Sequence, residues 1–225
     1  MLDSRSIPMA QVLVVCTGNI CRSPMAEGFL KELLRLRAGA ADETDDAEPT
    51  ATDEPIHVSS AGTSGWEGSP ATPEAVLAAA DREADISGHR ARRLAAHHIE
   101  QADLVIGMTT DHRDMAVHLV PTAAARTFTL KELVGLLDGL PEPAGSSVPD
   151  AARMRERAAM ADALRMDGFA VNRHDLDVVD PIGLSIDTYR AVAWELDELS
   201  GRLVDGLFGK APAPSSLAAM WKDGE

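Results

Sequence analysis

The chain has 225 residues, 45% of them hydrophobic, and carries a formal net charge of −15 at pH 7. This length is enough for one domain with an ordinary hydrophobic core, whereas the acidity argues against a nucleic-acid or anionic-membrane partner, since such surfaces need clustered Lys and Arg. No apolar stretch approaches the roughly 18 residues of a membrane span and the N-terminus lacks a signal-peptide pattern, so we expect a cytoplasmic protein.

Short apolar runs of β type alternate with helical stretches, which is the pattern of an α/β domain with a parallel sheet. The first expected strand is 11–15 (QVLVV), and it leads through a loop into a helix that begins near Pro24. One face of that helix is apolar and is expected to be buried. Its members are Ala26, Phe29, Leu30, Leu33 and Leu36.

Three further strands are expected at 56–59, 102–108 and 126–130. A helix at 111–119 is expected between the last two, and another at 131–137 after the last strand. Thr72 followed by Pro73 predicts a helix start, because a capping hydroxyl precedes a residue suited to the first helical position. Ser185 is the expected cap of the last helix. That helix carries one apolar face, formed by Tyr189, Val192, Leu196, Leu199 and Leu203.

Two segments interrupt this alternation within what we interpret as a single domain over 1–225. Residues 41–54 contain seven acids and no base, a composition that cannot bury enough apolar surface to order itself. We interpret about 38–55 as a solvated acidic loop insertion, with a docking element for a basic partner as the alternative. A second insertion, about 140–175, begins with a linker rich in Pro, Gly and Ser and continues into an expected helix at 149–166.

The candidate chemistry lies at the end of the first strand, in VVCTGNICRSPMAE. A strand that enters a Gly-containing loop and then a helix N-terminus gathers backbone N–H groups around one point, which suits a phosphate dianion. A thiolate of Cys16 at the floor of that ring would be stabilised as a nucleophile. Arg22 can return a planar guanidinium to the same centre and hold two phosphoryl oxygens. Gly18 and Asn19 tolerate the positive φ of a tight anion-binding turn.

A Cys followed six positions later by Arg is a weak signal by itself, because a buried small Cys beside a surface Arg would look the same. The preceding β run, the internal Gly-Asn pair and the amphipathic helix that follows all favour the phosphate loop. Cys16 and Cys21 are the only cysteines. They lie too close in sequence to staple a fold, which points to chemistry or redox sensing, and no Cys/His cluster has zinc spacing.

The segment CTGNICRSP resembles the signature of the low-molecular-weight protein-tyrosine phosphatases, a family that also includes bacterial arsenate reductases and protein-arginine phosphatases. The segments VSSAGTSGW, ISGHRARRL, ADLVIGM and VVDPIG resemble later parts of the same family. The resemblance implies a doubly wound fold in which helices flank a four-stranded parallel sheet. It also implies hydrolysis of phosphomonoesters through a phosphocysteine intermediate, with inorganic phosphate as product and no metal or cofactor.

The resemblance also assigns roles to individual residues. Thr17, Gly18, Asn19, Ile20 and Cys21 match the loop that surrounds the phosphate, and Ser23 matches a hydroxyl that hydrogen-bonds the thiolate. Asn19 also matches a polar network that holds the loop in shape. The other network members are Ser60 and His89.

Three of these matches have simpler alternatives. His89 could be an exposed surface histidine. Cys21, which matches a second loop cysteine able to trap an oxidised Cys16 as a disulfide, could be a small buried hydrophobe. Ser23 stands where any good helix cap would stand.

Two candidates lie outside the loop. Asp180 precedes Pro181, and Asp-Pro is an ordinary turn signal. A phosphatase, however, needs a proton donor for the leaving oxygen and then a base for the attacking water. One carboxyl can serve both steps, and Asp180 is the candidate. Trp66 matches an aromatic position beside the substrate cleft, with burial at the core edge as the alternative. Tyrosine phosphatases of this type usually carry aromatic residues after Asp-Pro, whereas this chain has Ile182 and Gly183.

Three functions follow as hypotheses. The first is hydrolysis of phosphotyrosine in proteins or of another small phosphomonoester, and Ile20 favours tyrosine over arginine because the arginine phosphatases place Thr there. The second is arsenate reduction with a small external thiol, since no cysteine after Cys21 is present to relay oxidation. The third, a non-catalytic phosphoprotein-binding module, is disfavoured because both Cys16 and Asp180 are present.

Overall fold

A four-stranded parallel sheet in the order β2-β1-β3-β4 organises the protein. The structure is a computed structural model that describes residues 10–42, 56–143, 148–169 and 175–210. The strands are β1 (Ala10–Cys16), β2 (Ile56–Gly62), β3 (Leu104–Gly107) and β4 (Thr127–Thr129). The central strand β1 pairs Val14 with Ser60 on one side and with Ile106 on the other. All four strands therefore end at the same edge of the sheet, where Cys16 terminates β1.

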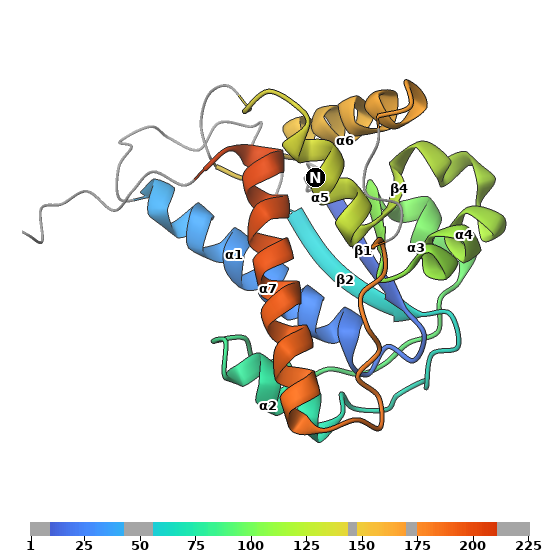
Figure 1. Cartoon of the computed structure of the whole chain (residues 1–225), viewed down its shortest axis with the longest axis vertical. Coiled ribbons are helices and arrows are strands. Elements are labelled where there is room, and N and C mark those ends of the chain that lie inside the picture. The colour runs from blue at the N-terminus through green and yellow to red at the C-terminus, as the bar shows by residue number, and fades with distance from the viewer. Residues whose placement is uncertain (1–9, 43–55, 144–147, 170–174, 211–225) are drawn as a thin grey trace, which may run out of the picture.

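Seven α-helices and one 3₁₀ helix are found in the described ranges. They are α1 (Arg22–Asp42), α2 (Pro73–Ala80), α3 (Ala96–Gln101), α4 (Thr110–Leu119), η1 (Pro121–Arg126), α5 (Leu130–Asp138), α6 (Ala151–Met166) and α7 (Ile186–Phe208). Figure 1 shows α1 and α7 crossing one face of the sheet, with α3 and α4 on the other side. The expected four-stranded doubly wound fold is thereby confirmed.

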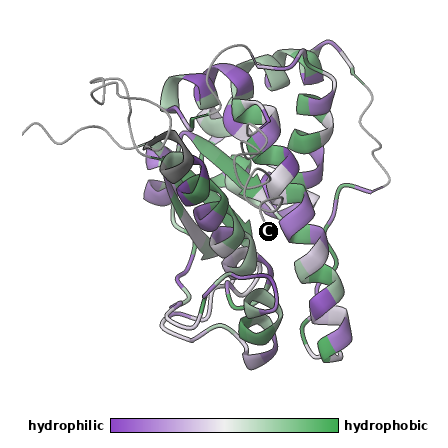
Figure 2. Cartoon of the chain, turned by 90° about the vertical axis from the view of Figure 1, so that its left-hand side faces the viewer, coloured by the Kyte–Doolittle hydropathy of each residue, from purple (hydrophilic) through white to green (hydrophobic). Residues whose placement is uncertain are grey.

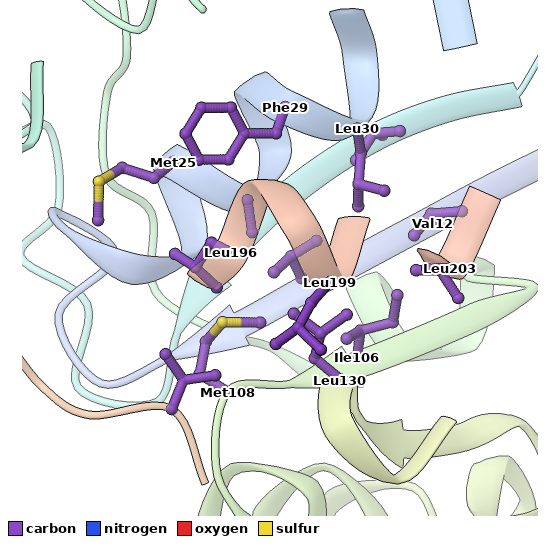
Figure 3. Packing of buried hydrophobic residues seen from close by; sticks show 14 of the residues in the cluster. Val12, Met25, Phe29, Leu30, Ile106, Met108, Leu130, Leu196, Leu199 and Leu203 are labelled. Atoms are coloured by element: carbon purple, nitrogen blue, oxygen red, sulfur yellow. The ribbon is translucent and has the colours of Figure 1, made fainter. Parts of the chain in front are cut away.

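The core has two parts because β1 is buried on both faces. Val12, Val14 and Cys16 face the larger cluster, which α1, α5 and α7 complete, while Leu13 and Val15 face the smaller cluster with α3 and α4. Figure 3 shows side chains of α1 and α7 meeting those of β1, β3 and α5 in the larger cluster. In Figure 2 the sheet is mostly hydrophobic and polar residues gather on the outer helix surfaces. Both faces of the sheet are therefore shielded, and its carboxyl edge is where polar chemistry is concentrated.

Capping residues explain where several helices begin. The Thr72 side chain accepts a hydrogen bond from the backbone N–H of Ala75, with Pro73 at the first helical position, as expected. Ser185 caps α7 through the N–H of Thr188, and the apolar face expected for this helix is buried. Both helix starts are confirmed.

The sequence interpretation of α1 was wrong at its C-terminal end. The helix continues to Asp42, so residues 38–42 are helical rather than part of a loop, and Leu36 is 52% exposed rather than buried. Figure 1 shows this end of α1 extending past the edge of the sheet. The rest of the expected acidic loop, 43–55, lies outside the described residues. No helix in the described ranges is long and apolar enough to cross a membrane.

Candidate active site

The loop between β1 and α1 closes around the Cys16 sulfur. The backbone N–H of Asn19 donates to Cys16 Sγ over 3.2 Å, and Ser23 Oγ, in the first turn of α1, lies 2.9 Å from the same sulfur. Asn19 has φ 57°, the left-handed conformation that turns its N–H inward. Cys16 is buried, and the N-terminus of a long helix points at it. The positive end of α1 and these donors favour negative charge at this sulfur.

Arg22 joins this loop to the segment that carries Asp180. Arg22 is buried. Its guanidinium donates from Nη1 to the carbonyl of Val178 over 3.1 Å and from Nη2 to Thr17 Oγ1 over 3.3 Å, and it forms an ion pair with Asp180. Val178 is itself anchored, since its N–H donates to the carbonyl of Met108 just past β3 over 2.8 Å. The fold thus brings Cys16, Arg22 and Asp180 together from positions up to 164 residues apart in sequence.

Asn19 is held from three directions. Its side-chain amide nitrogen, Nδ2, donates to Ser23 Oγ over 2.9 Å and to Ser60 Oγ over 2.7 Å. Its backbone carbonyl oxygen lies 2.8 Å from His89 Nε2. Ser60 in turn donates to Glu27 over 2.5 Å. The side chain of His89 is only 10% exposed, so the alternative of an exposed surface histidine is wrong. The structure therefore places Asn19, Ser60 and His89 in one hydrogen-bonded network, as the resemblance implied.

The proposed aromatic wall of the loop mouth is Trp66. The backbone N–H of Trp66 donates to the Gly18 carbonyl over 3.2 Å, and Trp66 is 58% exposed. This exposure excludes burial at the core edge. On the Asp180 side, Ile182 is 45% exposed and Gly183 has φ 74°. A second aromatic wall is absent at these two positions.

Ile20 and Cys21 turn away from the mouth. Ile20 is 4% exposed and packs in the larger core cluster, so only its backbone is available to a bound phosphate. Cys21 Sγ lies 3.4 Å from the Tyr189 hydroxyl, and burial raises the pKa of this thiol above its ordinary value. Burial likewise raises the pKa of Tyr189 to about 12. Cys21 is therefore a protonated thiol at neutral pH.

The sequence analysis missed His112, in the first turn of α4. Its Nε2 lies 3.0 Å from Thr17 Oγ1 and its Nδ1 lies 2.8 Å from Thr109 Oγ1. Burial, and then the nearby Arg22 charge, lower the pKa of His112 to about 4. The available signal was its place one turn beyond a buried strand, at the edge where Cys16 also lies.

The remaining carboxylates near Asp180 are committed elsewhere. Asp177 accepts from the N–H of Thr110 at the start of α4 over 2.7 Å, and Asp175 forms an ion pair with Lys131 at 2.7 Å. No group of three or more His, Cys, Asp or Glu in the described part of the chain is arranged to hold a metal ion. The arrangement therefore offers a nucleophile, an anion clamp and an acid from side chains alone.

A parallel sheet whose first strand ends in a Cys-to-Arg loop facing a carboxylate is the architecture of the small cysteine-dependent phosphatases. Residues 11–165 match the family model described as low molecular weight phosphotyrosine protein phosphatase. The chain belongs to this family.

Individual relatives agree in family and differ in the substrate they are named for. The chain is 30% identical over 197 residues to a protein-arginine-phosphatase of Geobacillus stearothermophilus, covering 88% of this chain and 95% of the relative. It is 36% identical over 132 residues to a low molecular weight protein-tyrosine-phosphatase of Acinetobacter johnsonii, covering 59% and 78%. The solved low molecular weight protein tyrosine phosphatase of T. tengcongensis is 31% identical with a TM-score of 0.58, covering 88% of this chain and 99% of that one.

Proposed function

We propose that the protein is a phosphatase that removes phosphoryl groups from proteins, phosphotyrosine foremost, through a phosphocysteine intermediate on Cys16. The observation that carries the proposal is the geometry around the sulfur: Asn19 N–H and Ser23 Oγ contact it at 3.2 and 2.9 Å, beside the buried Arg22. These contacts hold the sulfur at the N-terminus of α1, and the proposed reaction uses this sulfur as its nucleophile.

The reaction proceeds in two displacements. In the first, Cys16 Sγ forms a bond to phosphorus, the phosphorus–oxygen bond to the leaving group breaks, and Asp180 gives its proton to that oxygen. In the second, Asp180 takes a proton from water, the water oxygen bonds to phosphorus, and the sulfur–phosphorus bond breaks to release inorganic phosphate. Arg22 and the loop N–H groups bind the phosphoryl oxygens in both steps. The contact between Arg22 and Asp180 supports the proximity this mechanism needs, since a phosphoryl group that replaces Asp180 on Arg22 lies next to the carboxyl.

Replacement of the nucleophile tests this function. The Cys16→Ser variant is expected to lose turnover of p-nitrophenyl phosphate and to retain binding of phosphate or vanadate, because a hydroxyl keeps the loop shape and is a far weaker nucleophile. Steady-state kinetics and calorimetry measure the two properties. Cys21→Ser is the matched control and is expected to turn over normally. Turnover near the wild-type rate in the Cys16 variant would refute the assignment.

Phosphoarginine is the second candidate substrate. The similarity to the Geobacillus arginine phosphatase extends over 88% of the chain, and Ile182 leaves the mouth with a single aromatic wall. Trp66 supports phosphotyrosine, whereas Ile20, which the sequence pattern took as favouring tyrosine, is buried in the core and does not face the substrate. Kinetics on matched phosphotyrosine and phosphoarginine peptides, with arsenate and a thiol donor as a third arm, distinguish these substrates. A higher kcat/KM for phosphoarginine would replace phosphotyrosine as the assigned substrate.

We also propose that Cys21 protects Cys16 during oxidation. Peroxide converts the Cys16 thiolate to a sulfenic acid; the Cys21 sulfur then attacks that sulfur, a disulfide forms and water leaves. The two cysteines lie in one loop; because burial raises the pKa of Cys21, this thiol has to give up its proton as it attacks, and that proton leaves with the sulfenic hydroxyl as water. Reductant is expected to restore activity in the wild type and to fail in Cys21→Ser. Mass spectrometry that finds no Cys16–Cys21 disulfide after mild oxidation would contradict this role.

A further inference from the structure

Thr17 follows the nucleophile directly and its hydroxyl already has two partners. Arg22 Nη2 donates to Thr17 Oγ1 over 3.3 Å, and His112 Nε2 lies 3.0 Å from the same oxygen. Thr17 as a whole is nevertheless an exposed residue. The same Nη2 of Arg22 pairs with Asp180. Thr17 Oγ1 thus lies within hydrogen-bond distance of the guanidinium nitrogen that faces the reacting groups.

The direction of the Thr17 proton depends on His112. A neutral imidazole has one N–H donor and one acceptor nitrogen. On its far side, Thr109 Oγ1 accepts from the backbone N–H of His112 and lies 2.8 Å from Nδ1. If Thr109 donates its proton to Nδ1, then Nε2 carries the ring proton and donates it to Thr17. Thr17 Oγ1 then accepts from both His112 and Arg22, and its own proton is free.

The opposite proton arrangement satisfies the same contacts. Nδ1–H then donates to Thr109, and Thr17 donates to Nε2, which leaves Thr17 with only lone pairs to offer an entering anion. A phosphoryl oxygen is repelled by those lone pairs and attracted by a free hydroxyl proton. Binding of an anion therefore selects the arrangement in which His112 donates to Thr17.

We infer that His112 is a positioning residue for the phosphatase reaction: its Nε2–H holds Thr17 so that the Thr17 hydroxyl donates to a phosphoryl oxygen. The inference rests on the proposed function and adds a side-chain donor to the phosphate site. Four charged groups act on the ring: Arg22 from the phosphate loop, Asp111 on α4, and Asp177 and Asp180 from the loop before α7. Burial and Arg22 outweigh the three carboxylates, so the ring stays neutral, with a single ring proton, across the pH range above about 5.

Two substitutions of His112 separate this role from a structural one. His112→Asn keeps an amide near Thr109 and cannot reach Thr17, whereas His112→Gln extends an amide to the position of Nε2. Inhibition constants of inorganic phosphate and vanadate are measured against p-nitrophenyl phosphate. The Asn variant is expected to raise both constants about 10-fold, as for loss of one hydrogen bond to an anion, and the Gln variant is expected to stay within about threefold of wild type.

A double-mutant cycle with Thr17→Val tests whether His112 acts through Thr17. Thr17→Val alone is expected to raise the constants about 10-fold, and adding His112→Asn to it is expected to change them by less than about twofold. His98→Asn, in the first turn of α3, is the control and leaves them unchanged. Multiplying effects in the double variant, or an unaltered single Asn variant, would overturn the inference. Wild-type turnover reports separately on the proposed function, because a chain without turnover would refute the function itself.

Discussion

The Arg22–Asp180 ion pair joins the anion clamp and the acid of the proposed mechanism. Arg22 is 5% exposed at its side chain and Asp180 is 40% exposed. The guanidinium is fixed by Val178 and Thr17, while the carboxyl, within the described residues, also accepts from the backbone N–H of Ile182 at 3.2 Å. Asp180 is therefore the member free to turn toward a leaving oxygen when a phosphoryl group takes its place on Arg22.

Replacing Asp180 by Asn removes the proton donor and keeps the side-chain shape. Hydrolysis of esters with basic leaving groups is expected to slow by roughly 10² to 10⁴, the usual contribution of a positioned acid, while esters whose leaving group is a stable anion suffer less. The measurement is kcat against leaving-group pKa for a series of aryl phosphates. Asp177→Asn is the control, since Asp177 is bound to the N–H of Thr110. An equally flat dependence in the Asp180 variant and the wild type would show that Asp180 is a turn residue.

At the scale of single residues, a site residue can be predicted from the sequence when its partners are close to it along the chain. Cys16, Asn19 and Ser23 lie within eight positions of one another, so their pattern is visible in a single segment. His112 contacts Thr17 across 95 positions and Tyr189 contacts Cys21 across 168. Nothing local distinguishes these two from an ordinary first-turn histidine and a core tyrosine. Their roles follow only from the parallel sheet and from α7, which bring them to the loop.

At the scale of elements, the phosphate loop is held by the segment that follows β2. The N–H groups of Thr63 and Ser64 donate to the carbonyls of Cys16 and Thr17 over 2.9 Å. The approach is close: a Cβ at Gly62 would lie 2.6 Å from the Thr17 carbonyl oxygen. This packing and the Asn19 network together fix the loop before any ligand binds, which lowers the cost of organising it.

Ser60 is the link between β2 and that network. In Ser60→Ala, Asn19 and Glu27 each lose a buried partner, which costs about 1 to 3 kcal/mol when a polar group is left unsatisfied. We expect kcat/KM to fall about 10-fold while far-ultraviolet circular dichroism stays unchanged, because the defect is confined to the loop. Ser59→Ala, on the opposite face of β2, is the matched control. A Ser60 variant with wild-type kcat/KM would show that the loop keeps its shape without this link.

Element boundaries were predictable where a cap marked them and not where packing decided them. Thr72 and Ser185 are visible as caps, and both helices begin there. The end of α1 has no such mark. The helix continues past the exposed Leu36, whereas the acidic composition after Ala41 favoured a loop. Helix propensity and the continuing backbone hydrogen bonds explain why α1 extends to Asp42.

At the scale of the whole molecule, α6 contributes to the packing of the core. It packs against α5, α7 and η1. Arg157 donates to the carbonyls of Gly206 and Pro141 over 2.9 and 2.8 Å, and the Arg165 guanidinium lies 4.3 Å from the Phe128 ring centroid. Figure 1 shows α6 at the end of the molecule opposite α2. The sequence indicated a helix here, but its partners were not predictable because they lie on four different elements.

Met154 is a core residue of α6, and its replacement tests whether α6 stabilises the fold without affecting the active site. It is fully buried and lines a small cavity together with Val12 and Leu104, near the amino ends of β1 and β3. Met154→Ala is expected to lower the free energy of unfolding by about 2 to 5 kcal/mol, through lost apolar contact and the cavity left behind. Because the phosphate loop lies at the carboxyl end of β1, kcat/KM for p-nitrophenyl phosphate is expected to stay at the wild-type value below the unfolding transition.

Met160 supplies the matched control on the same helix, since it is 36% exposed. Met160→Ala is expected to change the free energy of unfolding by no more than about 0.5 kcal/mol, as at other surface positions. Urea titration of wild type and both variants measures the three free energies, and kinetics at the same temperature measures kcat/KM. Equal stabilities of the two variants would mean that α6 does not complete the core. A fall in kcat/KM confined to Met154→Ala would mean instead that α6 is coupled to the phosphate loop through β1.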